Sequence, residues 1–201
     1  MKTKEIGLIH LGLPKAGSTF LQKEFFPKLP FDVISNENLS GTTSTFKIEL
    51  DLGMSLSRLR KYSILQNLKK IYGDVPVLLV IRDKDSWIHS NYNQMVKNGL
   101  YGNTFEYFYN HMDKELLNFD NYINNIKKVF SNVFIIDFEI LKNNPQKFVD
   151  EICDWLNLES YKINSIIYNP SLSNNLLNLK RFCNRCYDYF WNHVYKINGG
   201  K

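Results

Sequence analysis

Short apolar runs alternate with amphipathic segments along most of the chain. Four of the runs have the length and the apolar character of strands, and they cover residues 6–11, 31–34, 75–81 and 133–138. The third run is almost wholly apolar, which is typical of a central parallel strand that helices cover on both faces. The pattern therefore predicts a sheet of at least four strands.

Apolar residues at helical spacing fill most of the chain between and after these runs. The predicted helices cover residues 18–26, 56–71, 85–97, 122–130, 145–156 and 176–190. Asn103 with Glu106 resembles a capping box that opens another helix, and Asn144-Pro145 is a good helix start. Strands alternating with helices predict an α/β protein with three layers, in which helices flank a mainly parallel central sheet. No repeat, low-complexity tract or linker divides residues 1–201, so we predict a single domain.

The composition is that of an ordinary globular protein. Of 201 residues, 44% are apolar and 22% are charged, and the formal net charge is +5. That charge suits a pocket for a polyanionic small molecule. The sequence has no clustered stripe of basic residues, so it does not indicate nucleic-acid binding. No apolar run approaches the length of a membrane span, and residues 6–13 are better interpreted as a buried strand than as part of a signal peptide. We therefore expect a cytoplasmic protein.

The three cysteines are Cys153, Cys183 and Cys186. An odd number without framework spacing indicates a reducing compartment. Cys183 and Cys186 form a C-x-x-C pair on the apolar stripe of the last predicted helix, and no second pair completes a zinc site. We interpret them as core residues, because a free cysteine behaves as a small hydrophobic residue. No cluster of His or carboxylate residues has metal-ligand spacing, so no metal cofactor is predicted.

Residues 12–19, Gly-Leu-Pro-Lys-Ala-Gly-Ser-Thr, lie between the first predicted strand and a helix. A loop in that position can hold phosphate, because backbone N–H groups at a helix N-terminus carry partial positive charge. Its two glycines and its threonine match the triphosphatase pattern G-x-x-x-x-G-K-[ST]. The lysine position, however, holds Ser18, and the lysine lies inside the loop as Lys15. The loop is P-loop-like and suits an anion, but it departs from the pattern needed for chemistry on an ATP γ-phosphate.

A second candidate phosphate site follows the apolar run at 75–81. Arg82 stands at the end of that run, and Ser90 lies early in the next predicted helix. Ligand sites in open α/β sheets lie at the carboxyl ends of strands, and an arginine fork with a hydroxyl suits one phosphate group. We therefore predict that Arg82 and Ser90 bind a second phosphate.

Residues 13–22, Leu-Pro-Lys-Ala-Gly-Ser-Thr-Phe-Leu-Gln, resemble the 5′-phosphosulfate loop of sulfotransferases that use PAPS (3′-phosphoadenosine 5′-phosphosulfate). The resemblance is closest to short bacterial carbohydrate-type members and extends over nearly the whole chain. It implies an enzyme that transfers the sulfuryl group of PAPS to a hydroxyl or amine and releases PAP (adenosine 3′,5′-bisphosphate), without a metal. It also implies a phosphosulfate-binding loop made of Pro14, Lys15, Ala16, Gly17, Ser18 and Thr19, in which Lys15 is also catalytic and helps the leaving group depart.

The same resemblance assigns the 3′-phosphate to Arg82 and Ser90, although the two residues after the arginine depart from the family's usual Asn-Pro. Residues 137–158 resemble a structural segment of the family. A later segment resembles one that closes over the nucleotide, and Ser171 and Arg181 are carried over from it. The acceptor is expected to be a saccharide or another small metabolite.

An acceptor hydroxyl needs a general base. We choose Glu37, in a polar loop after the second predicted strand, about where carbohydrate and tyrosyl-protein sulfotransferases place a glutamate. His89 is the alternative, although its helical direction differs from that of Ser90. His10 lies within the first predicted strand and is interpreted as a core histidine whose hydrogen bonds are satisfied.

Two other functions fit a loop-and-helix plan of this kind. A nucleotide or small-molecule kinase is the first alternative, and the position of Lys15 and the Arg82/Ser90 pair argue against it. A protein that binds PAP without turnover is the second, and the presence of both Lys15 and Glu37 argues against it.

Overall fold

The computed structural model describes residues 5–36, 39, 56–112, 114–163 and 172–190. Its strands form one sheet in the order β2-β1-β3-β4, and every neighbouring pair is parallel. In chain order the strands are β1 (Ile6–His10), β2 (Asp32–Ser35), β3 (Val77–Ile81) and β4 (Val133–Asp137). The four predicted strands and their parallel arrangement are confirmed.

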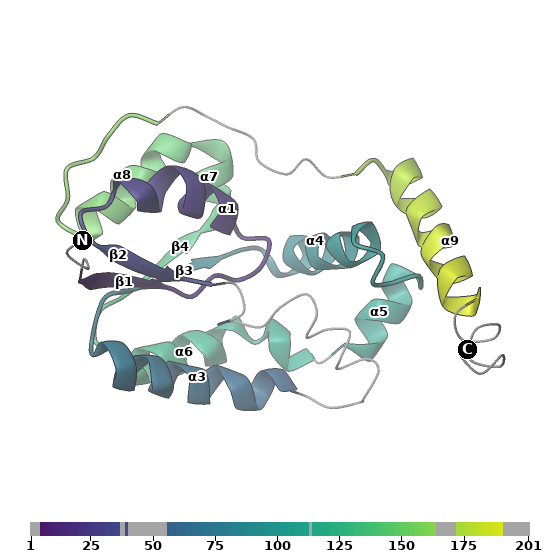
Figure 1. Ribbon diagram of the computed structural model, residues 1–201, viewed down its shortest axis with the longest axis horizontal. Coiled ribbons are helices and arrows are strands. Elements are labelled where there is room, and N and C mark those ends of the chain that lie inside the picture. The colour runs from purple at the N-terminus through teal and green to yellow at the C-terminus, as the bar shows by residue number, and fades with distance from the viewer. Residues whose placement is uncertain (1–4, 37–38, 40–55, 113, 164–171, 191–201) are drawn as a thin grey trace, which may run out of the picture.

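Helices cover both faces of the sheet, which gives the predicted three layers (Figure 1). One face carries α1 (Ser18–Phe20), its π-helical and 3₁₀ continuations η1 (Leu21–Phe25) and η2 (Phe26–Lys28), α7 (Phe138–Asn143) and α8 (Pro145–Trp155). The opposite face carries α3 (Leu56–Tyr72) and α6 (Phe119–Val129). The other described helices are α4 (Lys84–Lys97), α5 (Phe105–His111), η4 (Lys114–Leu117) and α9 (Asn174–Phe190).

Strand β3 lies at the centre of the hydrophobic core. Its first four side chains are completely buried: Val77, Leu78, Leu79 and Val80. The strand has β1 on one side and β4 on the other, and helices lie above and below the sheet. This position explains why the run contains no polar residue, since neither face of the strand meets water.

The sheet reverses its direction of growth between β1 and β3. The chain leaves β1 for β2 on one side and later returns to β3 on the other side of β1. In open α/β sheets such a reversal leaves a crevice outside the carboxyl ends of the two strands, and ligands bind there. The loop that begins after His10 and the arginine that follows Ile81 both lie at this point.

Side-chain caps fix where several helices begin. Asn144 Oδ1 accepts the N–H of Lys147 at 3.0 Å, which confirms the predicted start of α8. The predicted start of α5 is wrong by one residue: Thr104, not Asn103, accepts the N–H of Tyr107. Because the helix begins one residue later than predicted, Asn103 lies too far from the first turn to cap it.

The last helix contradicts the packing predicted for it. Cys153 is buried in α8, but Cys183 and Cys186 of α9 are exposed, so their interpretation as core residues is wrong. Leu176 and Leu179 on the same stripe are 54% and 60% exposed. A helical pattern specifies which residues share a face but not which element covers that face, and this is why the prediction failed.

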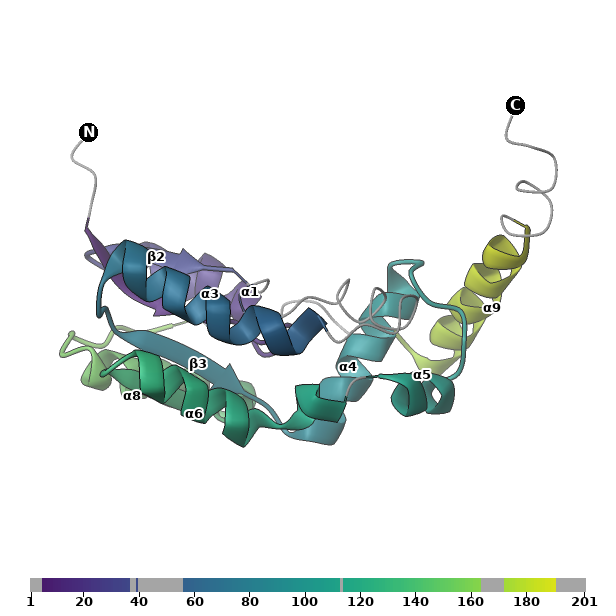
Figure 2. The same ribbon diagram turned by 90° about the horizontal axis from the view of Figure 1, so that it is seen from below.

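A polar contact attaches α9 to the rest of the molecule. Asn184 is buried, and its side-chain amide donates to the carbonyl oxygens of Val96 at 2.8 Å and Tyr101 at 2.9 Å. Figure 2 shows the consequence: α9 lies beside α4 and α5 at the end of the molecule that is farthest from the sheet.

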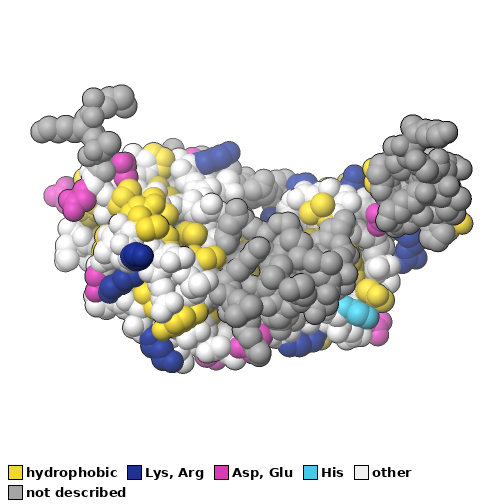
Figure 3. All heavy atoms as spheres, turned by 60° about the horizontal axis from the view of Figure 1, so that its bottom comes forward, with side chains coloured by type: hydrophobic (Ala, Val, Ile, Leu, Met, Phe, Trp, Pro, Cys, Tyr) yellow, Lys and Arg dark blue, Asp and Glu magenta, His cyan; other side chains and the backbone are white. Residues whose placement is uncertain are grey.

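The described surface has dispersed positive charge. On the face in Figure 3, the visible Lys and Arg side chains occur in small groups that are separated by uncharged surface. None of the described helices combines the length and the apolar character that a membrane span requires.

Candidate functional site

The loop after β1 has two residues in the left-handed backbone region. Lys15 has φ 65° and Gly17 has φ 87°. Helix α1 begins directly after Gly17, and no side chain caps it. The N-terminus of a helix carries partial positive charge, so the start of α1 can bind an anion at the crevice between β1 and β3.

Gly17 is required by both backbone conformation and space. Its positive φ is a region that residues with a side chain rarely adopt. A Cβ atom at this position would also come within 2.6 Å of Leu141 Cδ2 and 3.3 Å of the Phe138 ring. Helix α7 therefore closes one side of the loop, and only glycine fits against it.

The two candidate phosphate sites are joined by hydrogen bonds. Arg82 Nη1 donates to the carbonyl oxygen of Lys15 at 2.9 Å. Trp87 Nε1, which is buried in α4, donates to the carbonyl oxygen of Pro14 at 2.8 Å. Since these two carbonyl groups are held by the segment after β3, the shape of the loop depends on residues about 70 positions away in sequence.

Arg82 is half-buried and held in place from several sides. Its Nε donates to Ser86 Oγ at 3.0 Å, and its guanidinium lies 4.9 Å from the centre of the Phe138 ring. Burial lowers the pKa of Arg82, and the carboxylates of Glu139 and Asp83 oppose that shift. A guanidinium stays protonated under these conditions. Two of its N–H groups are bonded among the described residues, and a guanidinium has five, so others can bind an anion.

Lys15 reaches across the loop to α4. Its Nζ donates to Gln94 Oε1 at 3.0 Å, and the Gln94 amide in turn donates to Asn98 Oδ1 at 2.7 Å. The sequence analysis did not identify Gln94 as a partner of Lys15. The signal was its spacing: positions 86, 90 and 94 follow one another at intervals of four within α4, and such residues share a helix face.

Ser90 lies on that shared face of α4. One turn before it, Ser86 is bonded to Arg82, and one turn after it, Gln94 is bonded to Lys15. Ser90 is partly exposed. Because it lies one helical turn from both Ser86 and Gln94, it lies between the partners of Arg82 and Lys15 on this face. The described contacts join Arg82 to Ser86 and Lys15, so the pairing of Arg82 with Ser90 on one phosphate stays a prediction.

Ser18 has the character of a ligand-binding hydroxyl. It is the first residue of α1 and is only 3% exposed. Its Oγ finds no hydrogen-bond partner among the described residues. Leaving a buried hydroxyl unpaired costs about 1–3 kcal/mol, and an oxygen atom of a bound anion would remove that cost.

His10 and His89 have different surroundings. His10 is fully buried at the end of β1, and its Nδ1 lies 2.8 Å from Ser35 Oγ. The prediction of a core histidine is confirmed, but the prediction that it is satisfied is only half met, because its Nε2 has no hydrogen-bond partner among the described residues. Burial lowers the pKa of His10 to about 3, so the imidazole is neutral at physiological pH. His89 is exposed, and its ring stacks on Phe105 with 3.7 Å between ring centres.

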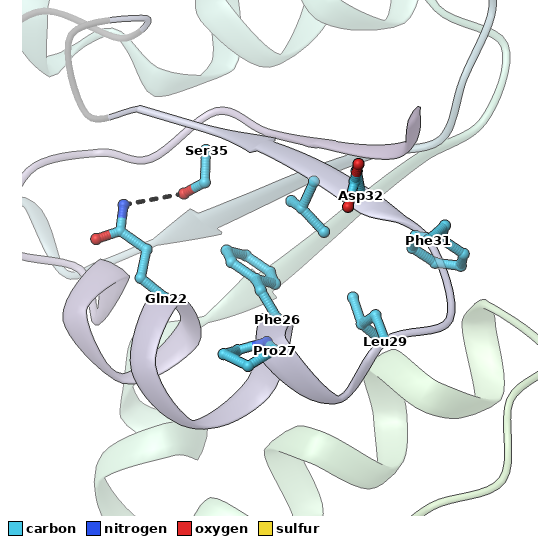
Figure 4. Close-up of a pocket in the computed structure, with 8 residues that line it drawn as sticks. Gln22, Phe26, Pro27, Leu29, Phe31, Asp32 and Ser35 are labelled. Atoms are coloured by element: carbon cyan, nitrogen blue, oxygen red, sulfur yellow. Dashed lines mark hydrogen bonds between the residues drawn. The ribbon is translucent and has the colours of Figure 1, made fainter. Parts of the chain in front are cut away.

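A shallow groove of about 340 Å³ lies between β2 and the helix that follows the loop (Figure 4). Its lining residues are Gln22, Phe26, Pro27, Leu29, Phe31, Asp32, Val33 and Ser35. At one end of the groove the Gln22 amide donates to Ser35 Oγ at 3.1 Å. Ser35 pairs with His10 at the carboxyl end of the sheet, and Gln22 lies one turn after Ser18. This end of the groove is therefore next to the loop.

The remaining predicted site residues are placed only in part. Glu37 and Ser171 lie outside the described residues. Arg181 lies on α9 and is partly exposed. Within the described ranges, no three His, Cys, Asp or Glu side chains lie close enough together to hold a metal ion.

Comparison with known proteins gives the family. Residues 8–180 match the sequence model of the sulfotransferase domain. The chain belongs to the sulfotransferase family. The matched part begins within β1 and ends within α9, so it includes the loop, Arg82 and the facing side of α4. The sulfotransferase is accordingly a transferase of sulfuryl groups, and the family predicted from the sequence is confirmed.

A solved structure supports the fold of this sulfotransferase. The crystal structure of a sulfotransferase from Alicyclobacillus acidocaldarius aligns with a TM-score of 0.55 and 17% sequence identity, and the alignment covers 83% of this chain and 87% of that chain. At this identity the match shows the α/β fold alone. A comparison with curated proteins found no match.

Proposed function

We propose that the chain, acting as one domain over residues 1–201, transfers the sulfuryl group of PAPS to a hydroxyl or amine of an acceptor and releases PAP. The observation that carries this proposal is the hydrogen bond from Arg82 to the carbonyl oxygen of Lys15. It joins two phosphate-binding elements at the point where the sheet reverses its growth. PAPS carries phosphate groups at both its 5′ and its 3′ ends, so a ligand with two anionic groups suits two joined sites.

The loop would bind the 5′-phosphosulfate. Backbone N–H groups at the start of α1, the buried Ser18 Oγ and the Thr19 hydroxyl would be its donors, while Pro14, Ala16 and Gly17 shape the turn. The 3′-phosphate would accept hydrogen bonds from Arg82 and Ser90, which approach from the end of β3 and from α4. Ser171 and Arg181 would add contacts to the nucleotide.

The chemical step is an in-line displacement at sulfur. The acceptor oxygen forms a bond to sulfur, the bond between sulfur and the bridging oxygen of PAPS breaks, and the acceptor proton passes to Glu37 as general base. Lys15 Nζ stabilises the negative charge that develops on the bridging oxygen. Because Nζ is bonded to Gln94 in this structure, Lys15 must exchange that partner for the donor. No metal is needed in this scheme.

The acceptor is proposed to be a saccharide or another small metabolite. The groove beside β2 combines partly exposed aromatic rings with an amide, a hydroxyl and a carboxylate, contributed by Gln22, Ser35 and Asp32. Binding sites of this kind use apolar surface for contact area and a few polar groups for orientation. Since one end of the groove adjoins the loop, an acceptor lying in it would bring a hydroxyl toward the sulfuryl group.

We place the activity in the cytoplasm. Cys183 and Cys186 are exposed free thiols, and free thiols persist in a reducing compartment.

The proposal is tested by titrating the purified protein with PAP and, separately, with ATP and Mg²⁺ in a calorimeter. We expect PAP to bind without metal, and Arg82→Ala to weaken binding at least tenfold. Lys128→Ala, an exposed residue of α6 on the other side of the molecule, is the matched control for loss of one positive charge, and it should leave PAP affinity unchanged. Because Arg82 also supports the loop, the unfolding transition of each variant is measured in parallel.

Two results would overturn the assignment. A preference for ATP with Mg²⁺ would favour the kinase alternative. PAP binding that is indifferent to Arg82 would show that the 3′-phosphate site lies elsewhere.

A further inference from the structure

The segment that follows β4 resembles a structural part of the family, yet its first residue lies at the candidate site. Strands β3 and β4 pair in parallel, and Ile81 lies opposite Asp137. Arg82 follows the first of these residues and Phe138 follows the second. The register therefore sets Arg82 and Phe138 side by side at the carboxyl edge of the sheet, where ligands of α/β proteins bind.

The ring of Phe138 lies against the guanidinium of Arg82. The distance from the guanidinium carbon to the centre of the ring is 4.9 Å, which is within the range of a cation–π attraction. Both side chains are only partly exposed. Because this attraction is stronger where water is excluded, the ring can hold the guanidinium in one place.

The same ring also meets the loop after β1. A Cβ atom on Gly17 would lie 3.3 Å from Phe138 Cδ2 and 3.4 Å from Phe138 Cε2. Helix α7, which begins at Phe138, lies beside α1 in Figure 1. The ring therefore stands between the loop and Arg82, and the two candidate phosphate sites share it as a wall.

The backbone that carries Phe138 is fixed by other residues. Asp137 caps α7, because its Oδ1 accepts the N–H of Glu139 at 2.9 Å. Leu141, in the next turn, is buried in the core. The cap and the buried leucine keep α7 in position, so a substitution at Phe138 tests the ring itself.

The surroundings of Arg82 hold the guanidinium without neutralising it. Its hydrogen bonds among the described residues go to the Ser86 hydroxyl and the Lys15 carbonyl oxygen, which are both uncharged. The carboxylates of Glu139 and Asp83 favour its charged form, but neither forms an ion pair with it in the described part of the chain. An aromatic ring attracts a cation and leaves its charge available, whereas a paired carboxylate would compete with a bound phosphate.

We propose that Phe138 is a positioning residue for PAPS binding, whose ring holds the guanidinium of Arg82 in the orientation that binds the 3′-phosphate. This inference rests on the proposed function, because it needs Arg82 to be a phosphate ligand. Phe138 acts through Arg82 and takes no part in the chemical step.

The test titrates the full chain with PAP and with adenosine 5′-monophosphate (AMP), which lacks the 3′-phosphate, in a calorimeter. Phe138→Leu keeps an apolar side chain but removes the aromatic face. It should weaken PAP binding about five- to tenfold and AMP binding less than twofold, a difference that a general loss of structure would not produce. Phe138→Tyr keeps the ring and should retain PAP affinity within twofold.

The matched control is Phe134→Leu. It removes a partly exposed ring from the same strand, which stacks on Trp155 with 5.1 Å between ring centres. Both affinities should stay unchanged in this variant. The urea unfolding transition of every variant is recorded, so that binding is compared among folded proteins.

A double variant separates the two contacts of the ring. In an Arg82→Ala background, Phe138→Leu should change PAP binding less than twofold, because the side chain that the ring positions is gone. A loss of PAP affinity that persists in this background would mean that the ring acts on the loop through Gly17, and the proposal would then be wrong.

Two further results would overturn the inference: equal weakening of PAP and AMP by Phe138→Leu, or PAP binding that this variant leaves within twofold of the original chain. Neither result touches the proposed function as long as Arg82→Ala weakens PAP binding. Loss of the proposed function is recognised differently, by PAP binding that is absent or indifferent to Arg82.

Discussion

The loop after β1 and helix α9 both carry distinctive sequence patterns, but they differ in how much of each is covered by other elements of the chain. Other elements hold the loop from three sides: Arg82 and Trp87 bind its carbonyl groups, and Leu141 closes against Gly17. Helix α9 is attached by the buried amide of Asn184 and by Leu177, which packs against the core, whereas the residues of its apolar stripe are exposed: Leu176, Leu179, Cys183 and Cys186. The sulfotransferase match covers the whole loop but ends at residue 180, before Cys183 and Asn184 of α9. Among the described residues, the same chain supplies the surroundings of the loop but leaves the apolar stripe of α9 exposed.

The difference shows what each pattern specifies. The loop pattern consists of residues with unusual backbone needs, such as the glycine at φ 87°, and it can function only where a strand meets a helix. The α9 pattern is a periodic distribution of apolar residues, which fixes a face but leaves its partner open. The first kind of pattern therefore predicts a site, whereas the second predicts only that something packs there.

The largest effect should come from the loop itself. Replacing Lys15 with alanine should lower the rate of sulfuryl transfer by about a hundred- to a thousandfold, the usual loss when a preorganised charge-stabilising group is removed. Slow transfer of the sulfuryl group from PAPS to water, followed as release of PAP, measures this without knowledge of the natural acceptor. Lys23→Ala, an exposed lysine of η1, is the matched control. A loss of less than threefold in Lys15→Ala would remove Lys15 from the chemistry.

The next effect separates backbone strain from crowding. Gly17 and Gly73 both have positive φ, 87° and 78°, but a Cβ atom at Gly73 would meet nothing within 4 Å. Gly73→Ala should therefore cost about 1 kcal/mol of unfolding free energy from strain alone. Gly17→Ala adds contact with Leu141, so it should cost about 2–3 kcal/mol and weaken PAP binding as well. Urea unfolding and calorimetry measure the two quantities; equal costs at both positions would mean that α7 does not close the loop.

The sequence predicted the fold because each strand is locally distinct. The buried run of β3 contains only apolar residues, and the proline after Asn144 marks the start of α8. The errors lie at ends and surfaces. The capping residue of α5 is Thr104 because the helix begins one residue later than the pattern suggested, and the two exposed cysteines of α9 depend on what surrounds the helix, which spacing does not encode.

The candidate site was predictable in its residue types but not in its connections. The loop and Arg82 could be identified from sequence because each follows a buried strand. The hydrogen bonds from Trp87 to Pro14 and from Lys15 to Gln94 join positions more than 70 residues apart. Such contacts depend on the angle between α4 and the loop, and a single sequence contains no measure of that angle.

A smaller effect is expected from His10, which ends β1 directly before the loop and makes the stability of the fold depend on pH. Its pKa is about 3 in the folded chain, against 6.5 for a free imidazole. Between these values the unfolded chain binds a proton that the folded chain does not, so stability falls as pH drops below 6.5. The expected loss between pH 7 and pH 5 is about 2 kcal/mol from this group. Urea unfolding at both pH values measures it, and His10→Asn should lose this part of the dependence. An unchanged dependence would mean that the buried imidazole becomes protonated in the folded state.

The smallest effect concerns the attachment of α9. Asn184→Ala removes the donors for the carbonyl groups of Val96 and Tyr101, which should destabilise the docked helix by about 1–2 kcal/mol. Hydrogen exchange of the α9 amides should then accelerate about 5- to 30-fold while β3 stays protected. Asn178→Ala, at an exposed position of the same helix, brings the same gain in helix propensity without loss of a contact, and it should leave exchange unchanged.

The same pair of variants measures how far the two regions depend on each other. If the loop, Arg82 and Ser90 supply most of the affinity for PAP, Asn184→Ala should keep its dissociation constant within about threefold, which corresponds to less than 1 kcal/mol. A tenfold loss in Asn184→Ala but not in Asn178→Ala would mean that a docked α9 is needed for nucleotide binding, as the candidate contact of Arg181 requires. The loop and α9 would then form one site, and the contrast between a fully supported region and a loosely attached one would apply only to the protein without nucleotide.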